Sequence, residues 1–214
     1  MLYLLLTAVF MGLLSSTVSI TRYKVDGELE KPILESLRTG LKKDILSEID
    51  DQLSEKAIGW TLFHSPYKPA FNGSSHVIGN YFIFSLRIDK KVLPAKIIKK
   101  HIALETEKRL NQVGRGYLTV NEKKMVKEHV LNMLSLRIPA TPSIYDLIWN
   151  YDASSLWFLT NLKGANEDLE TLFLKSFNLR LIRLFPYTSA DVTAGLSDKE
   201  KDVLLKLSPT VFWS

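Results

Sequence analysis

The segment from Arg87 to Arg137 constrains the fold most strongly, because it concentrates the positive charge of the chain. It holds thirteen Lys and Arg residues against five Asp and Glu, a net charge of +8, whereas the whole 214-residue chain has a net charge of +5. The rest of the chain is therefore slightly acidic. A local excess of this kind predicts a surface for a polyanion, either nucleic acid or an anionic membrane face.

The first half of this segment has the pattern of an amphipathic helix. Pro94 fits the first turn of a helix, and apolar residues recur at helical spacing from Ile97 to about Gln112. His101 falls on the apolar side, which predicts a core position for its ring. Gly114 and Gly116 then end the helix.

The second half predicts another helix, joined to the first by a short loop. Thr119 is followed three residues later by Glu122, which is the spacing of a capping box, and Pro139 ends the helical pattern. We therefore expect a basic two-helix hairpin that projects from a sheet and can present Lys and Arg to phosphates without reading bases.

A plainer interpretation is that these cations only solvate exposed helix faces. The sequence favours the polyanion surface because the Lys pairs at 90–91, 99–100 and 123–124 are uncompensated, whereas a merely solvated helix usually mixes the two signs.

The flanking sequence predicts an α+β fold with a mixed, mostly antiparallel sheet packed with helices. Tyr81–Ile88 is the strongest strand pattern and is expected to be central. The other expected strands are 13–25, 59–63, 143–151, 156–161 and 179–184. The other expected helices run from Pro32 to an interruption at Gly40, over 45–53, over 166–177 and from a cap at Ser197.

This pattern divides the chain into four parts. Residues 11–88 and 143–190 are expected to form an α+β central domain, residues 89–142 the basic arm, and residues 191–214 a C-terminal helix and tail. Residues 1–10 are interpreted as an extension, with Met11 as a possible start. The uncharged stretch from Leu2 to Ile20 leaves a membrane anchor or a secretory signal open as alternatives.

Composition narrows the function classes. A hydrophobic content of 46% excludes a disordered chain, and the absence of cysteine excludes disulfides, cysteine-ligated zinc and thiol catalysis. His64 and His76 are isolated, and the acids at 48, 50 and 51 fit a solvated helix face, so no metal or other cofactor is expected.

Catalytic motifs are weak. The triplets Asp89-Lys90-Lys91 and Glu122-Lys123-Lys124 match the end of some metal-dependent nuclease motifs, but no second carboxylate accompanies either. We expect no enzymatic activity, with a metal-dependent nuclease or a membrane-anchored interaction module as the alternatives.

Several short motifs, taken in order and spacing, resemble those of the bacterial recombination-associated protein family RdgC over residues 11–187. They are Gly59-Trp60, Asp89–Pro94, Ile97–Lys99 and Thr119-x-x-Glu122-Lys123. The resemblance implies a ring-shaped homodimer with a positively charged hole. Such a ring binds double-stranded DNA without sequence preference and restrains the recombinase RecA, and the location would be cytoplasmic and nucleoid-associated.

The resemblance also implies that the lysines at 90, 91, 96, 99, 100, 123, 124 and 127 contact DNA phosphates, and it supplies no catalytic residues; the cations at 108, 109 and 115 are added to the predicted set because they belong to the same basic segment. The predicted nucleic-acid contacts are Lys90, Lys91, Lys96, Lys99, Lys100, Lys108, Arg109, Arg115, Lys123, Lys124 and Lys127.

Overall fold

The structure is a computed structural model that describes residues 13, 15, 17–71 and 76–208. Within these residues the chain forms one sheet and six helices, which confirms the α+β class. The strands are β1 (Thr21–Asp26), β2 (Lys56–Thr61), β3 (Val77–Ile78), β4 (Tyr81–Lys90), β5 (Thr141–Asn150), β6 (Ser155–Phe158) and β7 (Arg180–Arg183). The helices are α1 (Ile33–Lys43), α2 (Ala95–Val113), α3 (Val120–Arg137), α4 (Lys163–Phe177), α5 (Pro186–Ala194) and α6 (Asp198–Lys206).

The sheet has the strand order β2-β4-β5-β6-β1-β7, with the short β3 paired to β4, and all of these pairings are antiparallel. The predicted central strand is confirmed, because β4 is buried on both faces from Phe82 to Asp89. Ten residues of β4 pair with β5, from Tyr81 opposite Asn150 to Lys90 opposite Thr141. This long ribbon is the platform from which the basic segment departs.

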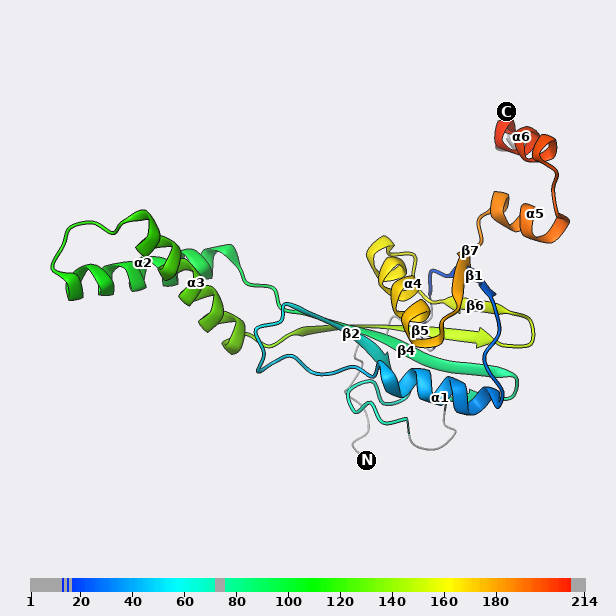
Figure 1. Cartoon of the computed structure of the whole chain (residues 1–214), viewed down its shortest axis with the longest axis horizontal. Coiled ribbons are helices and arrows are strands. Elements are labelled where there is room, and N and C mark those ends of the chain that lie inside the picture. Colours follow the sequence, from blue (N-terminus) through cyan, green and yellow to red (C-terminus); the bar gives the residue numbers. More distant parts are fainter. Residues whose placement is uncertain (1–12, 14, 16, 72–75, 209–214) are drawn as a thin grey trace.

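Helices α1 and α4 cover one face of the sheet, and the aromatic core lies between them and the strands (Figure 1). Trp60 is fully buried and meets Phe84 edge-on at 5.2 Å between ring centroids, with Phe173 at 6.5 Å. Such aromatic pairs stabilise a core beyond the apolar area that they bury. Phe173 also contacts Trp149 on β5, so these rings fix α4 against β2, β4 and β5.

The opposite face of β4 carries a buried polar row. Arg87 donates to both oxygens of Asp89, at 2.8 and 2.7 Å, and Ser85 donates to Asp146 on β5 at 2.6 Å. The loop after β2 covers this row, since the main-chain oxygen of Pro66 accepts from both Thr61 and Arg87. These buried groups are therefore paired with one another, as burial of charge requires.

Two helix predictions in the N-terminal half were wrong. Gly40 does not interrupt α1. It lies inside the helix. Glycine is needed there because a Cβ would come within 2.5 Å of the Phe177 ring on α4. The helix expected over 45–53 is absent, and the start of this segment pairs with the edge of β2 instead: the Trp60 N–H donates to Asp44 and the Leu46 N–H donates to Trp60.

The first strand is shorter than the predicted 13–25. It begins at Thr21, which pairs with Phe158, the last residue of β6, so the described residues 17–20 have no strand beside them. The expected extension at residues 1–10 lies outside the described residues. The sequence also missed β3 and α5, although Pro186 occupies the first helical position that favours proline.

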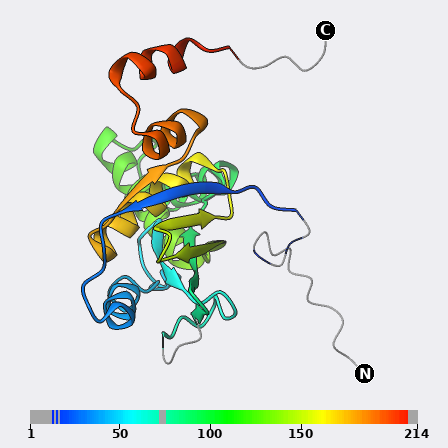
Figure 2. The same ribbon diagram turned by 90° about the vertical axis from the view of Figure 1, so that its right-hand side faces the viewer.

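Helices α5 and α6 follow β7 and stand away from the sheet (Figure 2). The predicted cap at Ser197 is confirmed, since Ser197 and Glu200 form a capping box at the start of α6.

Candidate nucleic-acid interface

The basic segment forms a helical hairpin inserted between β4 and β5. Lys90 and Thr141 are the last pair of the β4–β5 ladder, and all of α2 and α3 lies between them in the sequence. Figure 1 shows the hairpin projecting from the end of the ribbon, away from α1 and α4. With about 1.5 Å of rise per residue, the 19 residues of α2 extend about 28 Å. This hairpin is called the arm below.

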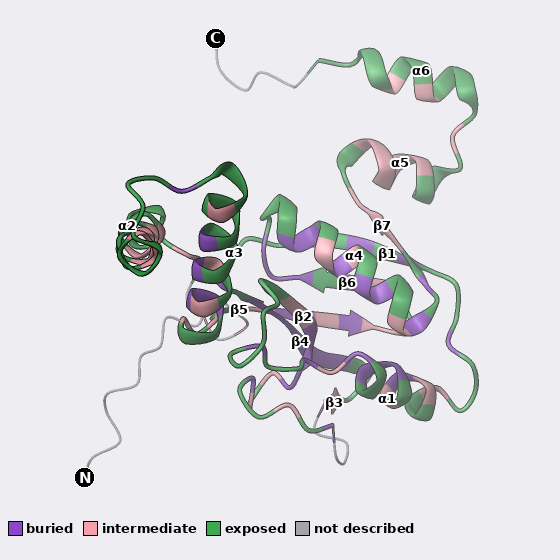
Figure 3. Ribbon diagram, turned by 60° about the vertical axis from the view of Figure 1, so that its left-hand side comes forward, coloured by how far each residue is buried: buried purple, intermediate pink, exposed green. Residues whose placement is uncertain are grey.

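The two helices of the arm contact each other along one apolar face of α3. Val126, Val130 and Leu134 are buried at four-residue spacing, while α2 has no buried residue (Figure 3). The half-buried positions of α2, including Ile98, Ile102 and Glu105, recur at helical spacing and mark the side that faces α3. His101 is on this side and only half-buried, so its predicted core position was wrong: the thin arm has no deep core to receive it.

The tip of the arm is held by the predicted helix-ending signals. Gly114 takes a left-handed conformation (φ 63°) and its N–H bonds to Leu110, which ends α2. The capping box at the start of α3 is confirmed, with Glu122 accepting from the Thr119 N–H at 2.7 Å. These hydrogen bonds and Arg115, whose Nη2 lies 2.7 Å from Glu122, hold the pKa of the Glu122 carboxyl below its usual range.

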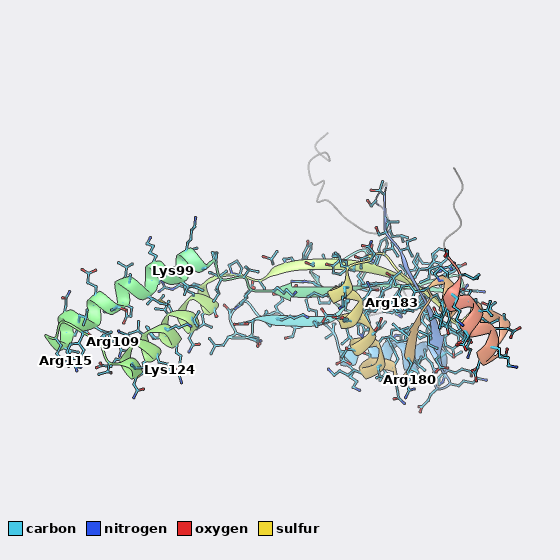
Figure 4. All side chains as sticks on the ribbon, turned by 90° about the horizontal axis from the view of Figure 1, so that it is seen from above. Lys99, Arg109, Arg115, Lys124, Arg180 and Arg183 are labelled. Carbon is cyan, nitrogen blue, oxygen red and sulfur yellow. The ribbon has the colours of Figure 1, made fainter. Side chains whose placement is uncertain are left out.

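Most of the predicted contact residues are exposed on the arm. In Figure 4, Lys99 lies on α2, Lys124 on α3 and Arg115 at the tip. Arg109 is half-buried beside α3. The exposed members of the predicted set are Lys90, Lys96, Lys99, Lys100, Lys108, Arg115, Lys123, Lys124 and Lys127.

The exposed cations differ in how far neighbouring acids balance them. Lys108 lies 3.8 Å from Glu105 and Lys124 lies 3.9 Å from Glu128, both on the surface where such pairs are weak. Within the described residues, no ion pair forms at the other exposed Lys residues of the set, which are Lys90, Lys96, Lys99, Lys100, Lys123 and Lys127. Because residues four apart share a helix face, Lys96 and Lys100 present two unbalanced charges side by side.

Lys91 is a correction to the predicted set. Its side chain is buried at the root of the arm, and Nζ donates to the main-chain oxygens of Asp50, Gln52 and Ser135 at 2.8, 2.7 and 2.5 Å. A phosphate cannot reach an ammonium group that is enclosed and already has three acceptors. The strand alternation explains the difference, because Lys90 and Lys91 point to opposite sides of the chain.

The two acid-Lys-Lys triplets are also placed by the structure. The Asp89 carboxylate is buried and bound by Arg87, and the Glu122 carboxylate is used in the capping box. In the part of the chain that the structure describes, no three His, Asp or Glu side chains gather as a metal site would need.

Sequence reasoning overlooked a second basic surface. Arg22 and Lys24 on β1 are exposed on the sheet face opposite the helices, while Tyr23 and Val25, which alternate with them, are buried. The signal was the alternation within the Thr21–Asp26 strand itself, which assigns the two cations to the outer face.

Comparison with known families decides the relationship. A family model described as "Putative exonuclease, RdgC" matches residues 19–190. The chain belongs to the RdgC family. The match includes the whole sheet and the arm, and it confirms the resemblance seen in the sequence motifs. Membership in the RdgC family supports a recombination-associated role. No curated protein matches the chain.

The apolar N-terminal stretch lies mostly outside the described residues. None of the helices in the described ranges has the length and apolar character needed to cross a membrane.

Proposed function

We propose that this RdgC-family protein binds double-stranded DNA without sequence preference and acts in recombination or replication. The arm would hold the duplex through its exposed Lys and Arg residues, which would contact backbone phosphates. Phosphate contacts position a protein on DNA but carry no sequence information, so this interface would give affinity without base readout.

The observation that carries this proposal is the run of exposed, unbalanced cations on a projecting hairpin. Five exposed Lys residues of the arm have no ion pair in the described part of the chain, and the helices that carry them stand clear of the sheet. A cation that already has a carboxylate partner must lose that contact to bind phosphate, whereas an unpaired one does not. Release of counterions from DNA would then supply the favourable free energy.

The family relationship extends the proposal to the assembly and its partner. We propose a homodimer that encloses DNA, restrains a recombinase and is located on the nucleoid in the cytoplasm. The exposed apolar residues at the tip of the arm, Tyr117 at 68% and Val120 at 83% exposure, are compatible with a contact between protein copies.

The test is reversal of charge on the arm. Changing Lys99, Lys100, Lys123 and Lys124 to Glu should abolish duplex binding measured by fluorescence anisotropy over a series of salt concentrations. A matched control changes four exposed Lys residues outside the arm, Lys31, Lys42, Lys68 and Lys199, to Glu and alters the net charge equally. Equal losses in both variants would show that total charge matters and that the arm does not.

The description of the family model favours one second candidate, an exonuclease. The Asp89 carboxylate is neutralised by Arg87, and Glu122 is committed to the helix cap, which supports binding without strand cleavage. Incubation of labelled single- and double-stranded DNA with Mg²⁺ or Mn²⁺ is expected to give no products. Degradation that Asp89→Ala stops would instead establish the nuclease.

A further inference from the structure

A pocket of about 510 Å³ opens where β1, β6 and β7 meet at one corner of the sheet. It lies at the end of the molecule opposite the arm, close to the position of Arg183 in Figure 4. Its volume falls within the range of small-ligand sites, about 300–1,000 Å³. The residues that the argument uses are Arg22, Trp157, Asn161, Arg183 and Phe185.

Two aromatic side chains line this pocket and remain exposed to solvent. Trp157 on β6 is 45% exposed and Phe185, after β7, is 55% exposed. Aromatic side chains of this size normally gain stability by burial, so their exposure around one pocket suggests a ligand with an apolar, planar part. The fold does not need either ring in its core.

The strand register places a cation beside the larger ring. Arg22 is directly opposite Trp157 in the β1–β6 ladder, and the main-chain oxygen of Arg22 accepts from Leu184 at 2.8 Å. The two side chains therefore lie next to each other on the sheet face opposite α1 and α4. The Arg22 guanidinium is exposed and makes no ion pair with any residue in the described ranges.

Arg183 is directly opposite Tyr23 in the β1–β7 ladder, so its side chain lies on the sheet face that α4 covers, whereas Arg22 and Trp157 lie on the other face. Its Nη2 lies 2.6 Å from Glu170, and its guanidinium sits 5.8 Å from the centre of the Tyr23 ring and 6.0 Å from that of Phe185. Arg183 is thus held in place and its charge is largely balanced. None of the described residues that line the pocket is acidic, which leaves Arg22 as its unbalanced charge and Asn161 as an exposed amide.

We propose that this corner binds an unpaired nucleotide of single-stranded nucleic acid. The base would stack on Trp157 and the adjacent phosphate would accept hydrogen bonds from Arg22. Single-strand sites combine aromatic platforms with cations in this way, because every base has a π-face and every nucleotide a phosphate. An acidic peptide would use Arg22 but leave the rings unoccupied, and the bases of a duplex are already stacked on one another. The site goes beyond the duplex contacts proposed for the arm.

The test compares two labelled ligands, a deoxythymidine decamer and a blunt duplex, by fluorescence anisotropy on the full chain. Trp157→Ala removes the stacking platform and should weaken decamer binding about tenfold or more. A tenfold loss corresponds to roughly 1.4 kcal/mol of binding free energy. Trp157→Phe, which keeps a platform, should retain most of the affinity, and Arg22→Gln should lower the salt slope by about 0.7. Duplex affinity should stay within about twofold of wild type for all three variants, since the arm is untouched. Tyr81→Ala, at an aromatic residue 44% exposed on β4, is the matched control.

Photochemical crosslinking of a 5-iodouracil decamer, mapped by mass spectrometry, should identify the peptide containing Trp157. Unchanged decamer binding in Trp157→Ala would overturn the proposal, as would equal losses for decamer and duplex. A change of oligomeric mass in Trp157→Ala without loss of decamer binding would also overturn it and would make the corner a contact between copies. Failure of the arm as a duplex site would appear separately, as duplex binding that survives the charge reversals at 99, 100, 123 and 124.

Discussion

The Nζ atom of Lys91 donates a hydrogen bond to the main-chain oxygen of Ser135 at 2.5 Å. Ser135 lies in the last turn of α3, where carbonyl oxygens have no partner within the helix and favour a cation. The same Nζ binds the oxygens of Asp50 and Gln52, and Ala140 donates to the Asp50 carboxylate at 2.8 Å. The loop before β2 thereby holds both crossings between the sheet and the arm.

Lys91→Met should therefore destabilise the protein without changing its contacts to DNA. Three main-chain oxygens, including that of the buried Ser135, would lose their donor, which should lower the free energy of unfolding by about 1–3 kcal/mol in urea denaturation. Lys90→Met, at the exposed neighbour, should leave stability nearly unchanged. If Lys91→Met instead lowered the salt dependence of duplex binding and left stability intact, the lysine would be a phosphate contact after all.

Gly59→Ala should be strongly destabilising, because β2 passes directly beside main-chain atoms of the preceding segment. A Cβ at Gly59 would lie 2.4 Å from Cα of Leu46 and 2.5 Å from its nitrogen. Backbone cannot move aside as a side chain can, so we expect a loss of about 1–3 kcal/mol in the free energy of unfolding. Gly164→Ala in the first turn of α4 meets no atom within 4 Å and should be neutral or slightly stabilising. Similar stabilities for both variants would contradict the close approach.

The contrast between Gly40 and Gly114 shows how much of the fold could be predicted from sequence. Gly114 ends α2 by taking a left-handed conformation, and a glycine that ends a helix in this way can be predicted from the sequence around it. Gly40 lies within α1, and it is a glycine because the Phe177 ring, which is distant in the sequence, packs where a Cβ would be. Residues 45–53 have a helical apolar period, yet they form no helix and Ile45 pairs with Trp60 at the edge of β2. Predictions failed where a distant partner overrode the local pattern.

The candidate site divides in the same way. Charge counting found the arm, and the Thr119–Glu122 cap positioned its second helix, because both signals are contained in one segment. The burial of Lys91 depends on a loop some forty residues earlier, which no local pattern reveals. The corner at Arg22 and Trp157 depends on the register between β1 and β6, which are far apart in the sequence, so composition alone does not predict that the two residues are neighbours.

Asp146 should make stability depend on pH. Burial raises the pKa of its carboxyl, and the hydrogen bonds from Ser85 and the Leu13 N–H offset this only in part. The folded state thus holds the proton more tightly than the unfolded state, so stability falls as pH rises from the ordinary Asp pKa of about 4 to the raised value. Asp146→Asn should gain stability relative to wild type over that range, measured by urea denaturation at several pH values. Asp152→Asn, at an exposed carboxyl, provides the control, and a stability difference for Asp146→Asn that does not change with pH would refute the effect.

The balance of charge along the arm predicts which lysines matter for duplex binding. Lys96 and Lys100 have no ion pair among the described residues, whereas Lys108 and Lys124 each lie within 4 Å of a glutamate, at 3.8 and 3.9 Å. If both unbalanced lysines contact phosphates, Lys96→Gln with Lys100→Gln should lower the slope of log affinity against log salt by about 1.8. Lys108→Gln with Lys124→Gln removes the same charge but frees two glutamates, so binding should weaken while the slope changes less. Equal slopes for the two double variants would mean that the arm acts as a diffuse positive field and that individual lysines make no defined contacts.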